Sequence, residues 1–248
     1  MTAVPSQGLD VSSYWPGRYR GRVVLVTGAA GGLGGAAVER LRAENAVVVA
    51  TDRVGADQEL DVTSEEQWER VCAQVLAEHG RIDGLLLAHG AQGPEVPVEE
   101  VDPADWRRTL SINLDSCFLG LRAVLPSMKR AGYGRVVALS SISGREGNAS
   151  MTAYSTSKAG VIALVKAAAK ESASQGVCIN AVAPSMFQTP LLQHLSAERN
   201  AELLSRVPAG RIGQPAEFAA LAAWLLSEEC SYTTGQVLDL SGGRYSGS

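Results

Sequence analysis

The chain has 248 residues, of which 46% are hydrophobic and 19% charged, so it is long and apolar enough for one compact domain with a sizeable core. Its formal net charge of -4 gives no reason to expect a nucleic acid or an anionic membrane as a partner. The four scattered cysteines and three scattered histidines show neither a disulfide framework nor metal-ligand spacing, so we expect no metal. Without a signal peptide or a membrane-length apolar run, a cytoplasmic protein is expected.

The first 20 residues contain several Pro, Gly and Ser and no sustained hydrophobic period. We expect an N-terminal arm over residues 1–20 and a single catalytic domain over residues 21–248. The aromatic side chains of the arm, Tyr14, Trp15 and Tyr19, are expected to pack on the domain or on a neighbouring subunit.

A glycine-rich loop separates the first expected strand, residues 22–27, from a helix that runs to about Arg42. The β-branched and apolar run of that strand is typical of burial on both faces. Glycines at this position let the backbone approach a pyrophosphate at the positive N-terminus of the helix. A glycine-rich loop between a buried strand and a helix therefore predicts a dinucleotide site. The loop residues expected to contact it are Gly28, Ala30, Gly31, Gly32, Leu33 and Gly34.

Asp52 ends the next expected strand, residues 46–51. Its distance from Gly28 is close to the ~20 residues at which an acidic side chain binds the adenosine ribose hydroxyls. A helix cap or turn residue is the alternative interpretation. Arg53 could tolerate a 2′-phosphate, but the carboxylate before it repels that phosphate, so NAD is favoured over NADP.

The middle of the chain continues the alternation of strands and helices. A short strand end is expected at residues 60–63, and Thr63 or Ser64 is expected to cap a helix that ends at His79. Residues 83–88 are the fourth expected strand. His89 follows at its carboxyl end, and a single histidine at such a place is more often structural than catalytic.

A proline-bearing loop over residues 93–102 precedes a long helical region over residues 103–130, with a break expected near Asn113. Asparagine is unfavourable inside a helix, so Asn113 is expected to make a buried hydrogen bond.

The stretch that follows the strand at residues 134–140 carries the candidate chemistry. Ser141 stands at the carboxyl edge of the sheet, where open α/β sheets bind ligands. If the next helix begins by Met151, Tyr154 and Lys158 lie one turn apart on one face. A phenol, an ammonium and a hydroxyl would then share a crevice and suit proton transfer to or from an alcohol or carbonyl oxygen. The alternative is that this Tyr-x-x-x-Lys arises by chance.

The last third of the chain supplies another strand at residues 177–183 and a loop, residues 184–189, that is well placed over a nicotinamide. Residues 190–211 are expected to form one or two helices of a substrate lid. A helix from Pro215 to Ser227 and a strand at residues 236–240 close the chain. Strands that alternate with helices predict a Rossmann-like, doubly wound parallel sheet of about seven strands with helices on both faces.

These motifs together resemble the short-chain dehydrogenase/reductase family, of the type without a large second domain. The resemblance runs from about Arg20 to Gly243. Thr27–Gly34 is similar to the Thr-Gly-x-x-x-Gly-x-Gly cofactor loop of that family, and Arg211–Pro215 and Thr234–Gln236 also resemble family segments.

The resemblance implies roles for individual residues. The catalytic tetrad would be Asn113, Ser141, Tyr154 and Lys158, with Tyr154 as the acid–base and Asn113 as the anchor of a water that relays a proton from Lys158. Asp61 and Val62 would contact adenine, and Thr189 would hold the carboxamide. Other expected cofactor contacts are Ala88, His89, Gly90, Pro184, Ser185 and Phe187, and expected substrate contacts are Ser141, Ser143, Met151, Tyr154, Ser185 and Met186.

Three segments depart from the family pattern. Where the family usually has Asn-Asn-Ala-Gly, this chain has Leu87-Ala88-His89-Gly90, so the two amides that normally stiffen the centre of the sheet are missing. Its Pro-Gly is Pro184-Ser185 here, and its Asp-Gly-Gly ending is Leu240-Ser241-Gly242-Gly243. None of these changes touches the proton-transfer residues.

The sequence therefore predicts an NAD-dependent oxidoreductase of secondary alcohols, namely polyols, cyclic diols or hydroxyketones, that forms a homotetramer. A carbonyl reductase using NADPH is one alternative. A dinucleotide-binding sensor without turnover is another, although its signature would be a broken tetrad. An epimerase is a third, although such relatives usually carry a larger C-terminal region.

Overall fold

The computed structural model describes residues 14–189 and 202–245. These residues form a seven-stranded sheet in the order β3-β2-β1-β4-β5-β6-β7, and every neighbouring pair is parallel. The predicted Rossmann-like class is confirmed. The strands are β1 (Val23–Thr27), β2 (Val47–Asp52), β3 (Gln58–Glu59), β4 (Gly84–Leu87), β5 (Gly134–Leu139), β6 (Val177–Pro184) and β7 (Val237–Leu240).

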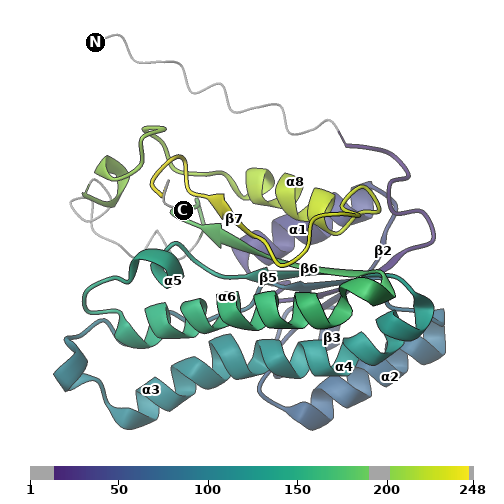
Figure 1. Cartoon of the computed structure of the whole chain (residues 1–248), viewed down its shortest axis with the longest axis horizontal. Helices are drawn as coiled ribbons and strands as arrows, with labels where there is room; N and C mark the ends of the chain where they lie inside the picture. Colours follow the sequence, from purple (N-terminus) through teal and green to yellow (C-terminus); the bar gives the residue numbers. More distant parts are fainter. Residues whose placement is uncertain (1–13, 190–201, 246–248) are drawn as a thin grey trace.

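Helices cover both faces of the sheet (Figure 1). The α-helices are α1 (Gly32–Ala43), α2 (Glu65–His79), α3 (Pro103–Leu110), α4 (Ser116–Ala131), α5 (Ser143–Glu146), α6 (Thr152–Ser172) and α8 (Pro215–Leu225). Helices α1 and α8 pack together on one face, while α4 packs against α2 and α6 on the other. Two hydrophobic cores lie on the two faces of the sheet. Because successive side chains of a strand point to opposite faces, β1 contributes to both: Leu25 packs on the α2/α4/α6 side and Val26 on the α1/α8 side.

Several boundaries differ from those expected. Strand β3 covers only Gln58–Glu59 and ends before Leu60, whose side chain is fully buried in the core. The four-residue helix α5 was not expected. The break near Asn113 is confirmed, because a π-helical turn, η2 (Ser111–Asp115), interrupts the region between α3 and α4. Short 3₁₀ turns occupy η1 (Val98–Glu100) and η3 (Ala173–Gln175).

Side chains cap the N-termini of α2 and α3. The Ser64 hydroxyl accepts a hydrogen bond from the Gln67 amide and so caps α2, as expected. Asp102 caps α3 in the same way through the Ala104 amide. Such caps fix where each helix starts and therefore how it meets the sheet.

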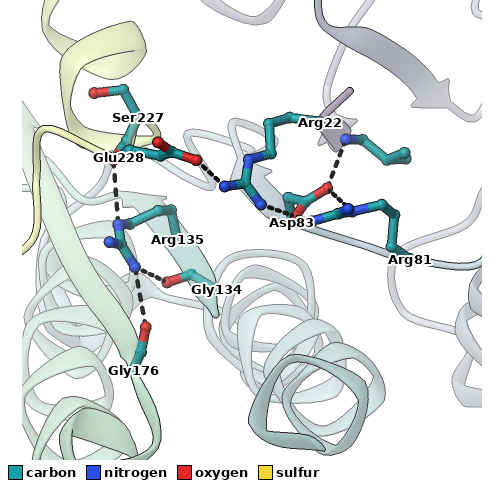
Figure 2. A network of polar contacts seen from close by, with 9 residues as sticks. Arg22, Arg81, Asp83, Gly134, Arg135, Gly176, Ser227 and Glu228 are labelled. Atoms are coloured by element: carbon teal, nitrogen blue, oxygen red, sulfur yellow. Dashed lines mark hydrogen bonds and ion pairs between the residues drawn. The ribbon is translucent and has the colours of Figure 1, made fainter. Parts of the chain in front are cut away.

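At the amino ends of the strands, the buried carboxylate of Asp83 is the centre of an ion network (Figure 2). Its carboxylate accepts hydrogen bonds from Arg22 at 2.9 Å, from Arg81 at 2.6 and 2.7 Å, and from the Val23 amide at 2.9 Å. Arg22 also pairs with Glu228 after α8. This network ties β1, β4 and the end of α8 together.

Arg135 extends the same polar layer (Figure 2). Its guanidinium donates to the carbonyl oxygens of Gly134, Gly176 and Ser227 and lies over the ring of Tyr133, with its Cζ 4.4 Å from the ring centroid. These polar groups therefore hold the amino ends of the strands together.

The described part of the arm, residues 14–20, packs on the domain. Tyr19 is 1% exposed, its hydroxyl donates to the Ala223 carbonyl and its amide to the Glu44 carbonyl. Burial raises the pKa of the Tyr19 phenol above its usual value. Tyr14 and Trp15 remain exposed. Residues 1–13 lie outside the described residues.

All four cysteines are free and buried. Burial raises the pKa of Cys72, Cys117 and Cys230 to about 11, so these thiols are poor nucleophiles. Within the described ranges, no group of three His, Cys, Asp or Glu could hold a metal, and no helix is both long and apolar enough to cross a membrane.

Candidate active site

A cavity of about 1070 Å³ opens at the carboxyl ends of the central strands. The glycine-rich loop after β1, the ends of β4, β5 and β6, and the first turn of α6 line it. This is the edge at which doubly wound sheets bind ligands. Its position confirms that the glycine-rich loop and the Ser141–Lys158 stretch meet at one place.

Two glycines of the glycine-rich loop, Gly28 and Gly34, stand where a side chain would clash with neighbouring backbone atoms. Gly28 has a φ of +66°, and a Cβ there would lie 2.7 Å from the His89 amide nitrogen. A Cβ on Gly34 would lie 2.1 Å from the Gly28 carbonyl oxygen. No side chain caps the N-terminus of α1, and no acidic residue stands in its first turn. The free amides and the helix dipole therefore fit a pyrophosphate.

Asp52 stands at the end of β2, beside the loop. Its carboxylate accepts hydrogen bonds from the amides of Ala30 at 3.1 Å and Arg53 at 2.7 Å. These bonds orient the carboxylate next to the loop. It remains partly exposed, so it is available to ribose hydroxyls.

Asp61 is held by its own turn. Its carboxylate accepts hydrogen bonds from the hydroxyl and the amide of Thr63, which keep the pKa of Asp61 below its usual value. Neither Asp61 nor Val62 lines the cavity, and the same is true of Gly28, Asp52 and Arg53. The remaining predicted cofactor residues all line it: Ala30, Gly31, Gly32, Leu33, Gly34, Ala88, His89, Gly90, Tyr154, Lys158, Pro184, Ser185, Phe187 and Thr189.

Ser141, Tyr154 and Lys158 face the same cavity. Helix α6 begins at Thr152, so Tyr154 and Lys158 share one face, and the Lys158 Nζ atom lies 5.9 Å from the Tyr154 ring centroid. Lys158 is only 2% exposed, and its ammonium donates to the Leu139 carbonyl at 2.7 Å. The Ser141 hydroxyl oxygen accepts a hydrogen bond from the Ser143 amide at 3.2 Å.

Asn113 lies behind the cavity wall and is fully buried. Its side-chain oxygen accepts from the Ala91 amide at 2.7 Å, and its amide donates to the Ala91 carbonyl at 2.8 Å and to the Ser157 hydroxyl at 3.0 Å. The expected buried hydrogen bonding is confirmed. A Cβ on Gly90 would stand 3.2 Å from both the Asn113 oxygen and the Lys158 ammonium, so the backbone of Gly90 packs directly against both side chains.

The predicted substrate residues Ser143, Met151, Ser185 and Met186 all line the cavity. Strand β6 runs through Pro184 and delivers the loop of residues 185–189 to the cavity edge. Of the expected lid, residues 190–201 lie outside the described residues, while Leu203 and Arg206 line the cavity.

Other lining residues were not predicted: Ala91, Gln92, Glu95, Leu139, Ser140, Ile142, Asn148, Ala149, Ser150 and Arg244. Most carry no motif, and they reach the wall because loops distant in the sequence converge there. Arg244 is held by Glu146 at 2.7 Å, so the end of the chain is tied to α5.

This fold and this site define a dinucleotide-binding oxidoreductase. A family profile described as Enoyl-(Acyl carrier protein) reductase matches residues 28–244. The chain belongs to the short-chain dehydrogenase/reductase family, and it is an oxidoreductase that acts on CH–OH groups.

Known relatives cover nearly the whole chain. It is 39% identical to 2-dehydro-3-deoxy-L-rhamnonate dehydrogenase (NAD(+)) of Sphingomonas sp. (strain SKA58), over 94% of this chain and 98% of that protein. It is 35% identical to 3-oxoacyl-[acyl-carrier-protein] reductase FabG of Salmonella typhimurium, over 92% and 98%. Among solved structures, levodione reductase has a TM-score of 0.87 and 32% identity, covering 91% of this chain and 98% of that one.

Proposed function

We propose that this protein transfers a hydride between a secondary alcohol and NAD, with Tyr154 as the acid–base. The observation that carries the proposal is the convergence of Ser141, Tyr154 and Lys158 on the cavity that the glycine-rich loop also lines. A phenol and an ammonium side by side, next to a free helix N-terminus, suit proton transfer beside a dinucleotide.

Bound NAD supplies the hydride acceptor for the substrate carbon. Tyr154 takes the proton of the substrate hydroxyl, and in the reverse direction it returns one. The Lys158 ammonium, with its Nζ atom 5.9 Å from the Tyr154 ring centroid, places a positive charge beside the phenol during the transfer. It donates one hydrogen bond to the Leu139 carbonyl, which leaves two hydrogens for the nicotinamide ribose hydroxyls.

Ser141 stabilises the developing charge on the substrate oxygen. The Ser141 oxygen accepts a hydrogen bond from the Ser143 amide, which orients the hydroxyl group. Its hydrogen can then be donated to the substrate oxygen. The side-chain amide of Asn113 is hydrogen-bonded to Ala91 and Ser157. Its proposed contribution is to hold the η2 turn beside Lys158, where a water can relay the proton.

NAD is expected to be used with a catalytic efficiency at least about tenfold above that with NADP, because Asp52 accepts ribose hydroxyls and repels a 2′-phosphate. Asp52→Ser should lower the catalytic efficiency with NAD about tenfold, the effect of losing a hydrogen bond to a charged group. It should therefore bring the efficiencies with NAD and NADP closer together. The measurement is kcat/KM with each cofactor. Equal or better use of NADP by the parent would mean that Arg53 dominates.

The proposed substrates are polyols, cyclic diols and hydroxyketones, because the wall mixes Ser143 and Ser185 with Met151 and Met186. A relative named for a deoxy sugar acid and a structural neighbour named for levodione support this range. The second candidate is a carbonyl reductase using NADPH, favoured by the acyl-carrier-protein relative.

A substrate screen that follows the absorbance of reduced cofactor tests the proposal. Arg206 and Arg244 add guanidinium groups to the wall, so each class of alcohol should include a carboxylated member. NAD binding without turnover of any alcohol would favour a sensor instead. Turnover only of ketones with NADPH would favour the second candidate.

A homotetramer is expected in solution. Helices α4 and α6 lie side by side on one face of the sheet (Figure 1). Phe118 of α4 is 51% exposed. Pairing of these helices across a two-fold axis would cover such a side chain. Light scattering should give the tetramer mass for the parent and a smaller mass for Phe118→Glu. A parent that is monomeric at micromolar concentration would contradict the prediction.

A further inference from the structure

His89 stands on the cavity wall immediately after β4, and the proposed mechanism gives it no step. Its Nδ1 atom lies 2.6 Å from the Thr27 hydroxyl, and its Nε2 atom lies 2.7 Å from the Ser116 hydroxyl. Thr27 and Ser116 are both fully buried. The imidazole therefore bridges the last residue of β1 to the first residue of α4.

The distances determine the direction of these hydrogen bonds. A neutral imidazole has one donor and one acceptor nitrogen. The Ser116 hydroxyl donates to the Ile112 carbonyl at 2.6 Å, so its oxygen accepts from His89 Nε2. Nδ1 is then the acceptor, and the Thr27 hydroxyl donates to it at 2.6 Å in preference to the Leu86 carbonyl at 3.3 Å.

The ring stays neutral at ordinary pH. Burial and, to a lesser degree, the positive charge of Lys158 lower the pKa of His89 to about 3. One tautomer therefore maintains the whole chain of bonds from Thr27 to the Ile112 carbonyl. Both ring nitrogens are already engaged, so the ring acts as a fixed brace and not as an acid–base for the substrate.

Both ends of this chain of bonds belong to the proposed machinery. Thr27 directly precedes Gly28, against which the His89 backbone packs so closely that a Cβ would be excluded. Ser116 follows the η2 turn that holds Asn113. The amides that usually stiffen this part of the sheet in the family are absent here, since Leu87 and Ala88 stand at their positions.

We propose that His89 is a positioning residue: in the absence of those amides, its two hydrogen bonds fix the cofactor loop against the Asn113 turn. Its Nδ1 bond would hold the loop for NAD, and its Nε2 bond would hold Asn113 and Lys158 for turnover. The turnover part rests on the proposed function, whereas the NAD part can be measured without any substrate.

Two substitutions separate the two bonds. In His89→Asn the amide group reaches the position of Nδ1, so the Thr27 contact is kept and the Ser116 contact is lost. In His89→Gln the amide reaches the position of Nε2, so the reverse holds. His89→Ala loses both. His79→Asn, at the end of α2, is a matched control away from the cavity.

The dissociation constant of NAD, measured by calorimetry without substrate, should rise about fivefold in His89→Gln and His89→Ala, the effect of one lost hydrogen bond. It should stay within twofold of the parent in His89→Asn. At saturating NAD, kcat should fall about tenfold in His89→Asn and His89→Ala and less in His89→Gln. His79→Asn should match the parent in both.

Variants that lower only the melting temperature, with kcat and NAD affinity unchanged, would show a purely structural histidine and overturn the proposal. Equal changes in both quantities in the Asn and Gln variants would also overturn it. If no alcohol is oxidised even by the parent, the proposed function fails. The NAD dissociation constants of the three His89 variants then decide by themselves whether His89 positions the cofactor loop.

Discussion

Tyr154→Phe is expected to lower turnover by ~10²–10⁴-fold, the range that positioned acid–base catalysis contributes. The substitution removes one oxygen and nearly preserves the shape of the ring, so folding and NAD binding should survive. No neighbouring group replaces the lost phenol. The Lys158 ammonium is bonded to the Leu139 carbonyl, and the Ser141 hydroxyl is a far weaker acid than a phenol. The measurement is kcat beside the NAD dissociation constant.

Lys158→Ala is the informative comparison, because Lys158 is proposed to serve both the tyrosinate and the ribose. It should reduce turnover and NAD affinity together, whereas Tyr154→Phe should reduce turnover alone. If Tyr154→Phe keeps turnover within a few-fold of the parent with NAD binding intact, Tyr154 is not the acid–base and the mechanism fails.

Gly34→Ala is expected to weaken NAD binding by at least about 10²-fold while the rest of the fold persists. The new Cβ would lie 2.1 Å from the Gly28 carbonyl oxygen, and a backbone atom cannot turn away as a side chain can. The loop must therefore open. Two charge-assisted hydrogen bonds to the pyrophosphate, worth about 1.5–3 kcal/mol each, would then be lost or lengthened.

Gly35→Ala is the matched control. It adds the same methyl group one residue later, where the Cβ would lie 3.3 Å from the Ala29 carbonyl oxygen, a contact that a shift of a few tenths of an ångström relieves. Calorimetric titration with NAD should give a dissociation constant near that of the parent. Equal affinities for Gly34→Ala and the parent would remove the glycine-rich loop from the dinucleotide site.

The architecture could be predicted from the sequence because its signals are local. Residues 23–26 are apolar throughout, and β1 is buried on both faces as such a run requires. Ser64 caps α2 and Pro215 opens α8 because a capping hydroxyl and a fixed φ act within one helical turn. The weakest boundary, β3, is a two-residue strand, too short to carry a period of its own.

Spacing within one or two elements was enough to predict the alternation of strands and helices along the chain, the glycine-rich loop, and the helical face shared by Tyr154 and Lys158. The hydrogen bonds of His89 to Thr27 and Ser116, which lie 62 and 27 residues away along the chain, became visible only in the folded structure. The same holds for Arg244, which reaches the cavity wall beside α5. Such contacts depend on how distant strand ends and loops meet in space, so they cannot be predicted from a local pattern of residue types.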